Sequence, residues 1–493
     1  MRPSSRSFVA LGAATGAFAI CVAVWLMNGV LVTFVDGNGI IELSQVQLGW
    51  LIGAPVLTGA LLRLPAGMLT DRFGGRPVFT LLMLVTAVAA FFTSYADSFV
   101  GLLLGGLGFG VAGATFAVGV AYASVWFPAN WQGTALGIFG AGNAGAVLTA
   151  MLGPALLDAL TRQGTDLEGW RNFPRVYAAV MLVTAIVFWA VTQNRRPEQS
   201  SQKRLSQRLR PLADVRVWRY GLYYFFAYGG FVALSQWLIP YYVNLYTMSL
   251  AAAGFMASFF SLPAAAVRII GGWLSDKLTP RTVLIGSFTA CLVLLALLFP
   301  PRMDVQTPGP GISADRAGVV REVTEFGVRV DDDLYSFTPE SGGVRIRLGP
   351  EAAEEPTALL PRSSLVQQPV VGVGDEVVAG QLLVQGTTHI YFQANVWVMT
   401  ALVVLLAVAM GFAAGAVYAQ IPADFASDVG TVGGIVGVLG ALGGFFTPII
   451  FGYLLEGTGI WTSSWMFMFV LALAGLAWMH LSGRRTTSAD RRD

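Results

Sequence analysis

The stretch VLTGALLRLPAGMLTDRFGGR, residues 56–76, decides the class of protein to which this chain belongs. It begins as an apolar run and ends in a charged segment that contains Asp71, Arg72 and Arg76. Arg63 interrupts the apolar run eight residues before Asp71. A helix rises about 1.5 Å per residue, so Arg63 would lie roughly 12 Å from the charged end. That depth approaches the middle of a hydrocarbon core about 30 Å thick. We therefore expect a membrane helix with a permanent charge near its centre.

Composition extends this expectation to the whole chain. Of 493 residues, 55% are hydrophobic and only 12% are charged, whereas soluble domains carry about 25% charged residues. Apolar runs of membrane-spanning length recur twelve times, and Gly and Pro inside them are tolerated in membrane helices. The predicted spans are residues 8–35, 44–70, 77–95, 98–126, 131–159, 171–192, 217–246, 249–276, 281–300, 391–419, 429–456 and 461–483. The sequence therefore predicts an all-α, polytopic membrane protein.

The distribution of Lys and Arg predicts the orientation of these spans. With a cytoplasmic N-terminus, the basic linker between spans six and seven lies inside, and the short outside loops carry only Arg162, Arg171 and Arg175. The inside segments would also carry Arg2, Arg6, Arg72, Arg76, Lys277, Arg281, Arg484, Arg485, Arg491 and Arg492. Because short cytoplasmic loops are enriched in Lys and Arg, both termini are expected in the cytoplasm. The linker could also bind lipid or a partner, but a solvated loop explains it more simply.

An internal repeat divides the chain into two six-helix halves. LRLPAGMLTDRFGGRPV aligns with VRIIGGWLSDKLTPRTV 205 residues later, which pairs Arg63 with Arg268. Residues 127–154 align with residues 421–448 at an offset of 294, so 89 residues were inserted between the two alignments. The predicted units are the first half at 1–192, a cytoplasmic linker at 193–216, helices seven to nine at 217–300, an insertion at 301–389, and helices ten to twelve with a cytoplasmic tail at 390–493.

The insertion at 301–389 differs in composition from the spans around it. It carries 13 acidic and 7 basic side chains, and its polar and apolar residues alternate as in short strands. We expect a small β-rich domain on the extracytoplasmic side. Its VGDEVVAGQLL segment looks like a turn of biotinyl or lipoyl carrier domains, but the insertion has no lysine to modify. A structural or docking role is therefore the simpler expectation.

Arg63 and Arg268 share a second property, which is that the spans hold no acidic residue at a comparable depth. The twelve spans contain no Asp, Glu or Lys away from their ends, and His389 and His480 are peripheral. A charge at mid-membrane costs several kcal/mol, and duplicated halves bring equivalent positions to a shared interface. We therefore expect both arginines to bind an anion that arrives from water, and the planar guanidinium suits a flat oxyanion. The alternative is that they bond only to backbone carbonyls and water.

Several motifs together resemble the nitrate/nitrite porters of the major facilitator superfamily. They are GMLTDRFGGR after the second span, the glycine-rich GIFGAGNAGA and GTVGGIVGVLGALGGFFTP of the fifth and eleventh, and YGGFVALSQWLIPYY in the seventh. The resemblance covers nearly all of the chain outside the insertion. It implies that Arg63 and Arg268 clamp the substrate, that Asn143 is the signature asparagine, and that Phe116, Tyr224 and Tyr228 hold the flat anion between aromatic rings. The motif residues expected to control conformational change are Gly67, Asp71, Arg72, Arg76 and Asp276.

The chemistry of these residues agrees with the implied roles. Asn143 offers an amide donor to an oxyanion, although it could instead bond one helix to another. Tyr224 and Tyr228 are four residues apart and share a helix face, with an interfacial belt as the alternative. The signature glycines lack side chains, so we expect them to let helices slide and tilt rather than to bind substrate directly. They are Gly140, Gly142, Gly145, Gly433, Gly434, Gly437 and Gly440.

The predicted function is alternating-access transport of nitrate and nitrite across a bacterial cytoplasmic membrane. Without an intramembrane Asp, Glu or His relay, nitrate/nitrite exchange is favoured over nitrate/proton symport. A porter for another small anion, or a sensor or docking protein, is the alternative. We expect no enzymatic activity, catalytic residue, cofactor, metal ion or nucleic-acid partner. The expected partners are the two anions, membrane lipid and an extracytoplasmic protein for residues 301–389, and we expect a monomer.

Overall fold

The computed structural model describes residues 4–195, 210–300, 303–324, 326–337, 346–348, 362–392, 394–425 and 429–489. The chain separates into two compact units. The first comprises Met1–Phe299, Thr400–Thr458 and Ser463–Asp493, and the second comprises Pro300–Met399 and Gly459–Thr462. Most of the predicted linker, residues 196–209, and the terminal arginines Arg2, Arg491 and Arg492 lie outside the described residues.

The first unit is helical. Within the described ranges, twelve helical segments are long and apolar enough to cross a membrane, and each coincides with one predicted span. The first six spans are built from α1 (Ser5–Trp25), α2 (Asn28–Gly37), α3 (Gln45–Phe73), α4 (Gly75–Thr93), α5 (Phe99–Phe109), η1 (Gly110–Ala114), α6 (Thr115–Trp126), α7 (Ala129–Gly140), η2 (Ala141–Ala144), α8 (Gly145–Leu160), η3 (Leu167–Arg171) and α9 (Asn172–Val191). The last six are built from α11 (Val215–Tyr224), η5 (Phe225–Gly229), α12 (Gly230–Tyr246), α13 (Leu250–Lys277), α14 (Pro280–Leu297), α15 (Val396–Asp424), α16 (Val429–Thr458) and α17 (Ser463–Ala489). η4 (Arg210–Ala213) precedes α11.

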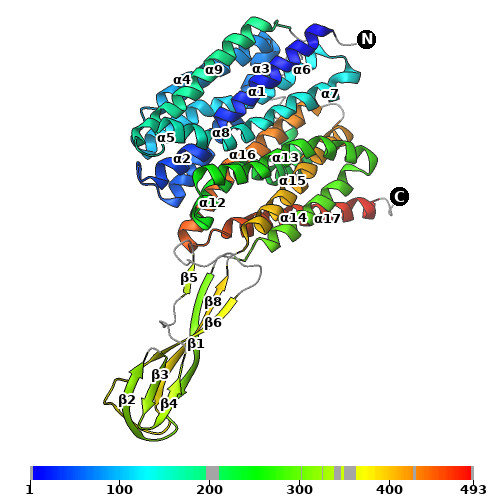
Figure 1. Ribbon diagram of the computed structural model, residues 1–493. Coiled ribbons are helices and arrows are strands. Elements are labelled where there is room, and N and C mark those ends of the chain that lie inside the picture. Colours follow the sequence, from blue (N-terminus) through cyan, green and yellow to red (C-terminus); the bar gives the residue numbers. More distant parts are fainter. Residues whose placement is uncertain are drawn as a thin grey trace. The chain divides into compact units, whose positions relative to one another are not determined.

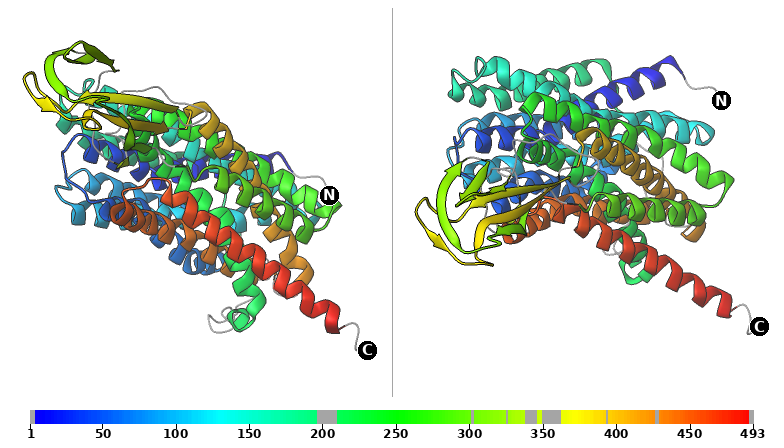
Figure 2. Two further views of the ribbon diagram at one scale, coloured as in Figure 1. Left: turned by 90° about the horizontal axis from the view of Figure 1, so that it is seen from below. Right: turned by 60° about the horizontal axis from the view of Figure 1, so that its bottom comes forward.

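Helix α1 begins and helix α17 ends at the same end of the helical bundle, which Figures 1 and 2 show from three directions. An even number of spans requires this arrangement. We call it the termini end, and the opposite end, where α3 begins, the distal end. The predicted all-α architecture of twelve spans with a β-rich insertion is thus confirmed.

The two halves of the bundle meet most closely along α3 and α16 at the distal end. Glycines make this approach possible, because a Cβ on Gly49 would lie 2.4 Å from the Pro448 carbonyl oxygen and one on Gly53 would lie 2.6 Å from that of Phe445. A polar contact adds to this packing, since the Val46 amide donates to the Glu456 carboxylate at 3.1 Å.

Pro55 inside α3 leaves one backbone carbonyl without its usual helical donor, and a neighbouring helix supplies a replacement. Pro55 has no N–H, so the carbonyl of Leu51 lacks its usual helical donor. The Asn28 amide donates to that oxygen at 2.7 Å, and Trp25 donates to the Pro55 oxygen at 2.9 Å. These buried bonds join the first span to α3 near the distal end.

The second unit consists of antiparallel strands in two sheets. Its strands are β1 (Met303–Ser313), β2 (Gly318–Thr324), β3 (Gly327–Val330), β4 (Asp333–Ser336), β5 (Ile346–Leu348), β6 (Arg362–Pro369), β7 (Glu376–Val377) and β8 (Leu382–Phe392). One sheet has the order β5-β1-β8-β6 and the other β4-β3-β2-β7. The core of this unit contains Ala314, Val320, Val328, Val330, Phe337, Val377, Leu383 and Val384.

Strand β8 changes one predicted boundary. It pairs Phe392 with Met303 and Tyr391 with Asp304 of β1, so the tenth span begins at Val396 rather than at residue 391. The run HIYF, residues 389–392, is apolar enough to extend a span, but its backbone is hydrogen-bonded to β1 as a strand. The length of an apolar run alone does not reveal whether it forms a strand or extends a membrane helix.

Candidate functional site

Arg63 lies on α3 at the interface between the two halves and is 94% shielded from solvent, with 6% of its surface exposed. Its Nη1 donates to the carbonyl oxygen of Gly437 on α16 at 2.9 Å, and its Nη2 donates to the Tyr228 hydroxyl at 3.2 Å. Its Nε makes a longer contact of 3.5 Å to the carbonyl oxygen of Gly113 in η1. The ring of Phe116 lies 5.3 Å from the guanidinium carbon. Arg63 therefore contacts both halves.

Arg268 lies on α13 and faces a different kind of surface. Its guanidinium carbon is 5.5 Å from the ring centres of Tyr224, Tyr228 and Tyr418. Tyr228 is shared, because the Arg63 guanidinium carbon lies 5.6 Å from the same ring. The structure thus brings the two repeat-related arginines to one tyrosine.

Among the described residues, neither Arg63 nor Arg268 forms an ion pair with Asp or Glu. Two guanidinium charges therefore share a largely buried aromatic site. The alternative considered for the sequence, in which an arginine bonds to backbone carbonyls, describes two of the contacts of Arg63. It does not describe the ring-faced surroundings of Arg268.

Tyr224 and Tyr228 form the aromatic centre of the site. Their rings stack with centroids 5.0 Å apart and planes 6° apart. The segment between them is not α-helical, because Phe225–Gly229 forms a π-helical turn. A π turn holds more residues than an α turn, so residues four apart stand almost directly above one another. The shared face predicted for the two tyrosines is present, and the π turn aligns their rings.

Tyr418 on α15 belongs to this cluster, and the sequence analysis missed it. Its ring meets that of Tyr224 edge to face at 5.0 Å, and its hydroxyl donates to the Gly433 carbonyl oxygen at 3.0 Å. The sequence around it, GFAAGAVYAQIPAD, is a plain apolar helix that ends in a proline. No spacing or motif distinguishes Tyr418 there, and only the packing of α15 against α16 does so.

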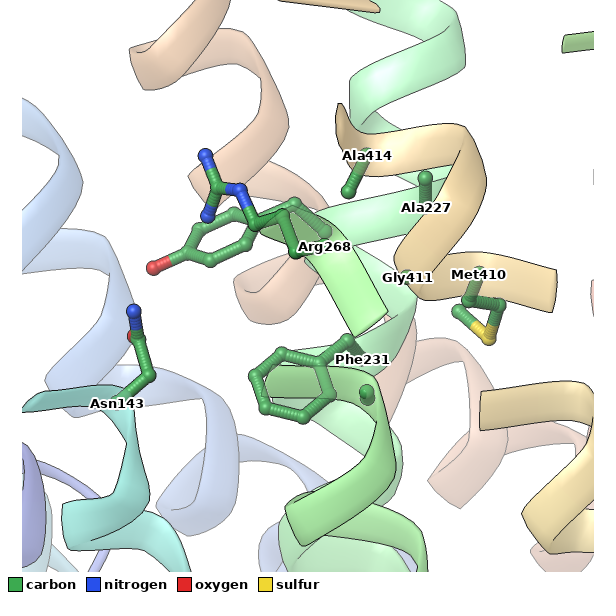
Figure 3. Close-up of a pocket in the computed structure, with 9 residues that line it drawn as sticks. Asn143, Ala227, Phe231, Arg268, Met410, Gly411 and Ala414 are labelled. Atoms are coloured by element: carbon green, nitrogen blue, oxygen red, sulfur yellow. The ribbon is translucent and has the colours of Figure 1, made fainter. Parts of the chain in front are cut away.

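Asn143 lines a small cavity beside Arg268. It lies in the short 3-10 segment η2, and its amide donates to the Gly140 carbonyl oxygen of its own helix at 2.8 Å. The bond from helix to helix considered for this residue is therefore replaced by a local one. The cavity is lined by Asn143, Ala227, Tyr228, Phe231, Ala264, Arg268, Met410, Gly411 and Ala414. Figure 3 shows Asn143 and Arg268 reaching it from separate helices.

The signature glycines do three different things. Gly437 and Gly433 supply the carbonyls that bind Arg63 and Tyr418. Gly440 makes room for a ring, because a Cβ there would lie 2.0 Å from Cδ1 of Tyr224. Gly142 and Gly145 instead pack against α1, whereas Gly140 and Gly434 have no atom within 4 Å of a built Cβ. The purely mechanical role expected for these glycines is therefore incomplete, since two of them hold site residues through their backbones.

The conformational motif lies at the termini end, away from the arginine pair. Arg76 stacks on Trp189 at 4.0 Å and donates to its carbonyl oxygen at 2.5 Å. Its repeat partner Arg281 donates to the Met479 carbonyl oxygen at 3.0 Å. Each arginine thus ties the third helix of its half to the sixth. The other motif residues, Gly67, Asp71, Arg72 and Asp276, lie in the last turns of α3 and α13.

Comparisons with known proteins agree with this geometry. The sequence profile described as Major Facilitator Superfamily matches residues 8–313. A "Probable nitrate/nitrite antiporter NarK1" of Thermus thermophilus is 35% identical over 95% of this chain and 90% of its own length. A "Nitrite extrusion protein" of Bacillus subtilis is 24% identical over 95% and 93%. A bacterial homologue of the human lysosomal transporter Spinster, solved inward-facing and occupied, has a TM-score of 0.64 at 17% identity and covers 98% of each chain. The chain therefore belongs to the nitrate/nitrite porter family of the major facilitator superfamily.

Proposed function

We propose that this protein transports nitrate and nitrite across the cytoplasmic membrane by alternating access, and that it exchanges one anion for the other. One observation carries the proposal. Arg63 and Arg268 come from opposite halves, lie within 5.6 Å of the same Tyr228 ring, and have no acidic partner among the described residues. A buried charge left without a counter-ion is strongly destabilising, so an anion is the group that this site lacks.

The aromatic surroundings favour a small, flat, monovalent ion. Phe116 and Tyr228 face Arg63, and Tyr224 and Tyr418 face Arg268. Ring faces leave little room for a tetrahedral or extended anion, and they supply few hydrogen-bond donors. A guanidinium donates two parallel hydrogen bonds to two oxygens of a planar oxyanion. Nitrate and nitrite, the anions named for the relatives, have this shape.

The mechanism follows from the charges of the two halves. Two like charges near one Tyr228 ring repel each other, and this repulsion opposes closure of the empty transporter. An anion between the halves would lower that repulsion and allow the bundle to rearrange around it. The described spans offer no acidic partner to the arginines that could replace the anion, so return with a second anion is favoured over empty return. A transporter that returns only with a second anion bound exchanges one anion for another.

The further features of the protein are part of the same proposal. We propose that both termini are cytoplasmic in a bacterial inner membrane, that membrane lipid surrounds a monomer, and that the protein is a transporter without enzymatic activity. The division of the chain at 1–192, 193–216, 217–300, 301–389 and 390–493 is our proposal for its functional units. An extracytoplasmic partner for residues 301–389 is also proposed. No metal ligand cluster occurs in the part of the chain that the structure describes.

Nitrate uptake into proteoliposomes tests the proposal. Vesicles loaded with nitrite should take up nitrate much faster than empty vesicles, and Arg63→Lys and Arg268→Lys should abolish this uptake. Lysine keeps the charge but loses the planar fork. Arg6→Lys, at an exposed position near the N-terminus, is the matched control and should transport normally. Fast uptake into empty vesicles driven by a pH gradient would replace exchange with proton symport.

Substrate identity needs a separate competition experiment. Nitrite should compete strongly with nitrate, whereas phosphate should compete weakly because it is tetrahedral and divalent. Stronger competition by formate or another carboxylate than by nitrite would point to a porter for a different small anion. Absence of transport for every small anion would favour a sensor or docking protein.

A further inference from the structure

The two arginines are equivalent in the internal repeat but not in their surroundings. Arg63 is held by carbonyl oxygens of Gly437 and Gly113 and by the Tyr228 hydroxyl. Arg268 lies against three tyrosine rings, with a side-chain hydrogen bond to Tyr224, and borders the cavity, of which Arg63 is not a lining residue. Backbone carbonyls therefore hold Arg63, whereas Arg268 lies beside a cavity.

The repeat explains where this difference originates. At the offset of 294 residues that relates the fifth span to the eleventh, Asn143 corresponds to Gly437. Arg63 of the first half contacts position 437 of the second half, and Arg268 of the second half shares its cavity with position 143 of the first half. Each arginine thus meets the repeat-related position of the opposite half. Arg63 donates to the Gly437 carbonyl oxygen, whereas Arg268 borders a cavity that Asn143 also lines.

The cavity is small and is bordered by one charged group and one side-chain amide. Its volume is about 20 Å³, above the roughly 10–15 Å³ that one water needs. Arg268 is its charged lining residue, and Asn143, 7% exposed, adds an amide. The remaining walls are mostly apolar, with Phe231, Met410 and Ala414 on the side away from the first half (Figure 3). An apolar wall strengthens the attraction between a cation and an anion held against it.

We propose that a small oxyanion is held off centre in this conformation, by Arg268 and Asn143 in this cavity, and that Arg63 binds it only after the Arg63–Gly437 contact breaks. The inference rests on the proposed function and assigns the two arginines successive roles. Arg268 captures the anion. Arg63 exchanges a backbone carbonyl of α16 for the anion, so anion binding at Arg63 and movement of α16 are one event.

Equilibrium binding of nitrate to the purified full-length protein in lipid nanodiscs tests this order, because binding and transport separate the two roles. Arg268→Gln should weaken nitrate binding by about tenfold or more, which corresponds to roughly 1.4 kcal/mol. Arg63→Gln should leave nitrate binding within about threefold of the unchanged protein. Both variants should lose nitrate/nitrite exchange in proteoliposomes. Equal losses of binding in the two variants, or a larger loss in Arg63→Gln, would overturn the proposal.

Two variants of the cavity itself keep the test decisive if Arg268→Gln fails to fold. Asn143→Asp places a negative charge beside the anion and should weaken nitrate binding, whereas Asn244→Asp should not. Asn244 is the matched control because its amide also donates to a carbonyl of its own helix, that of Pro240, at 2.8 Å. Ala414→Val should narrow the cavity and weaken binding. Ala409→Val, at a buried alanine of the same helix outside the lining set, should not.

The outcomes distinguish this inference from the proposed function. If the unchanged protein binds chlorate or formate but neither nitrate nor nitrite, the substrate assignment is wrong, and the same variants are compared with the anion that binds. If nitrate binds and only the cavity variants behave like their controls, the off-centre position is wrong and the transport assignment survives. If no small monovalent anion binds at all, both proposals are wrong.

Discussion

At the scale of single residues, the site is defined by two guanidinium groups that have no carboxylate partner among the described residues. Each buried arginine requires compensation, which tyrosine rings supply in part through their negative faces. A cation over an aromatic face gains about 0.5–2 kcal/mol, depending on how much water is excluded. That gain is smaller than the several kcal/mol that a mid-membrane charge costs. The part of the cost that the rings do not offset explains why the site should attract an anion from solution.

Tyr418 gives the first prediction at this scale. Its ring faces Arg268 and its hydroxyl donates to the Gly433 carbonyl oxygen, so substitutions can remove the hydroxyl alone or the whole ring. Tyr418→Phe keeps the ring and should retain nitrate binding with slower exchange. Tyr418→Leu removes the ring that holds the Arg268 guanidinium in position, so nitrate binding should weaken by a factor of about three to thirty, the size of a lost cation–π contact. Equal binding of nitrate by the Leu and Phe variants in nanodiscs would contradict a role for the ring.

The signature glycines give a matched pair of substitutions. Gly440→Ala would place a Cβ 2.0 Å from the Tyr224 ring, so we expect the protein to lose about 1–3 kcal/mol of stability through overpacking. Gly434→Ala meets no atom within 4 Å, and it should leave thermal unfolding unchanged or slightly raise the Tm, because alanine favours helix. Tm values of the two variants in nanodiscs check this. A destabilised Gly434→Ala together with a normal Gly440→Ala would show that the packing is misassigned.

Exchange rates of the same two variants test the expected gating role. Gly434 and its repeat partner Gly140 both face open space in this conformation. If they form close helix contacts in the other conformation, Gly434→Ala should slow exchange without lowering the Tm. A normal exchange rate in Gly434→Ala would restrict the gating role to glycines that pack closely in this conformation, such as Gly142, Gly145 and Gly440.

Departures from regular α-helix bring the site together at the scale of elements. The 3-10 segment η1 contains Gly113, η2 contains Asn143, and the π turn η5 contains Tyr228. Each irregular turn changes the direction of the side chains that follow it, and mid-helix 3-10 and π turns often mark functional positions. Three spans of this protein carry such a turn beside a residue of the site.

Helix α11, which leads into the π turn, begins with a titratable cap. The Asp214 carboxylate accepts from the backbone N–H of Arg216 at 2.8 Å and pairs with its guanidinium at 2.8 Å. The Arg216 guanidinium lowers the pKa of Asp214 from its ordinary value. A carboxyl with a lowered folded-state pKa stabilises the protein above its unfolded-state pKa of about 3.9, and the contribution is lost as the pH falls through the folded value.

We therefore expect Asp214→Ala to lower stability by about 1 kcal/mol at pH 7, the usual cost of losing an N-cap. The difference from the unchanged protein should shrink below about pH 4. Asp214→Asn keeps a capping oxygen, so its stability at pH 7 should lie between that of Asp214→Ala and that of the unchanged protein. Thermal unfolding in nanodiscs at pH 7 and at pH 3.5 measures these differences, and a difference independent of pH would exclude the charge contribution.

At the scale of the whole molecule, the inter-half contacts set the conformation of the helical unit. The close glycine contacts of α3 with α16 run from the distal end up to Arg63 and Gly437. The bundle is therefore closed at its distal end. With the termini in the cytoplasm, as we propose, this is the extracytoplasmic end.

The insertion gives the prediction that belongs to this scale. Its unit has its own core, and Met303 and Phe392 are paired residues of β1 and β8. Paired residues on antiparallel strands lie only about 5 Å apart, so a short Gly/Ser linker can replace residues 303–392. We expect the shortened protein to fold and to exchange nitrate for nitrite at a normal rate. A folded but inactive product in the proteoliposome assay would assign the insertion a role in transport, whereas loss of a bound partner alone would support docking.

The sequence by itself determined the number of spans, the repeat and the two arginines. Apolar length reports burial in lipid directly, and a charge within such a run stands out because lipid penalises it so strongly. The two repeat offsets also located the insertion. Candidate site residues in recognisable motifs, Arg63, Arg268 and Asn143 among them, could therefore be proposed from the sequence.

Only the tertiary structure decided which groups these residues contact. Tyr418 carries no local signal, and the π turn that stacks Tyr224 on Tyr228 depends on how α11 and α12 pack against α16. The difference between the arginines arises because a Gly437 carbonyl reaches Arg63 while a cavity lies beside Arg268. Backbone carbonyls and empty volume belong to the packing of distant segments, and no residue type in the sequence encodes them.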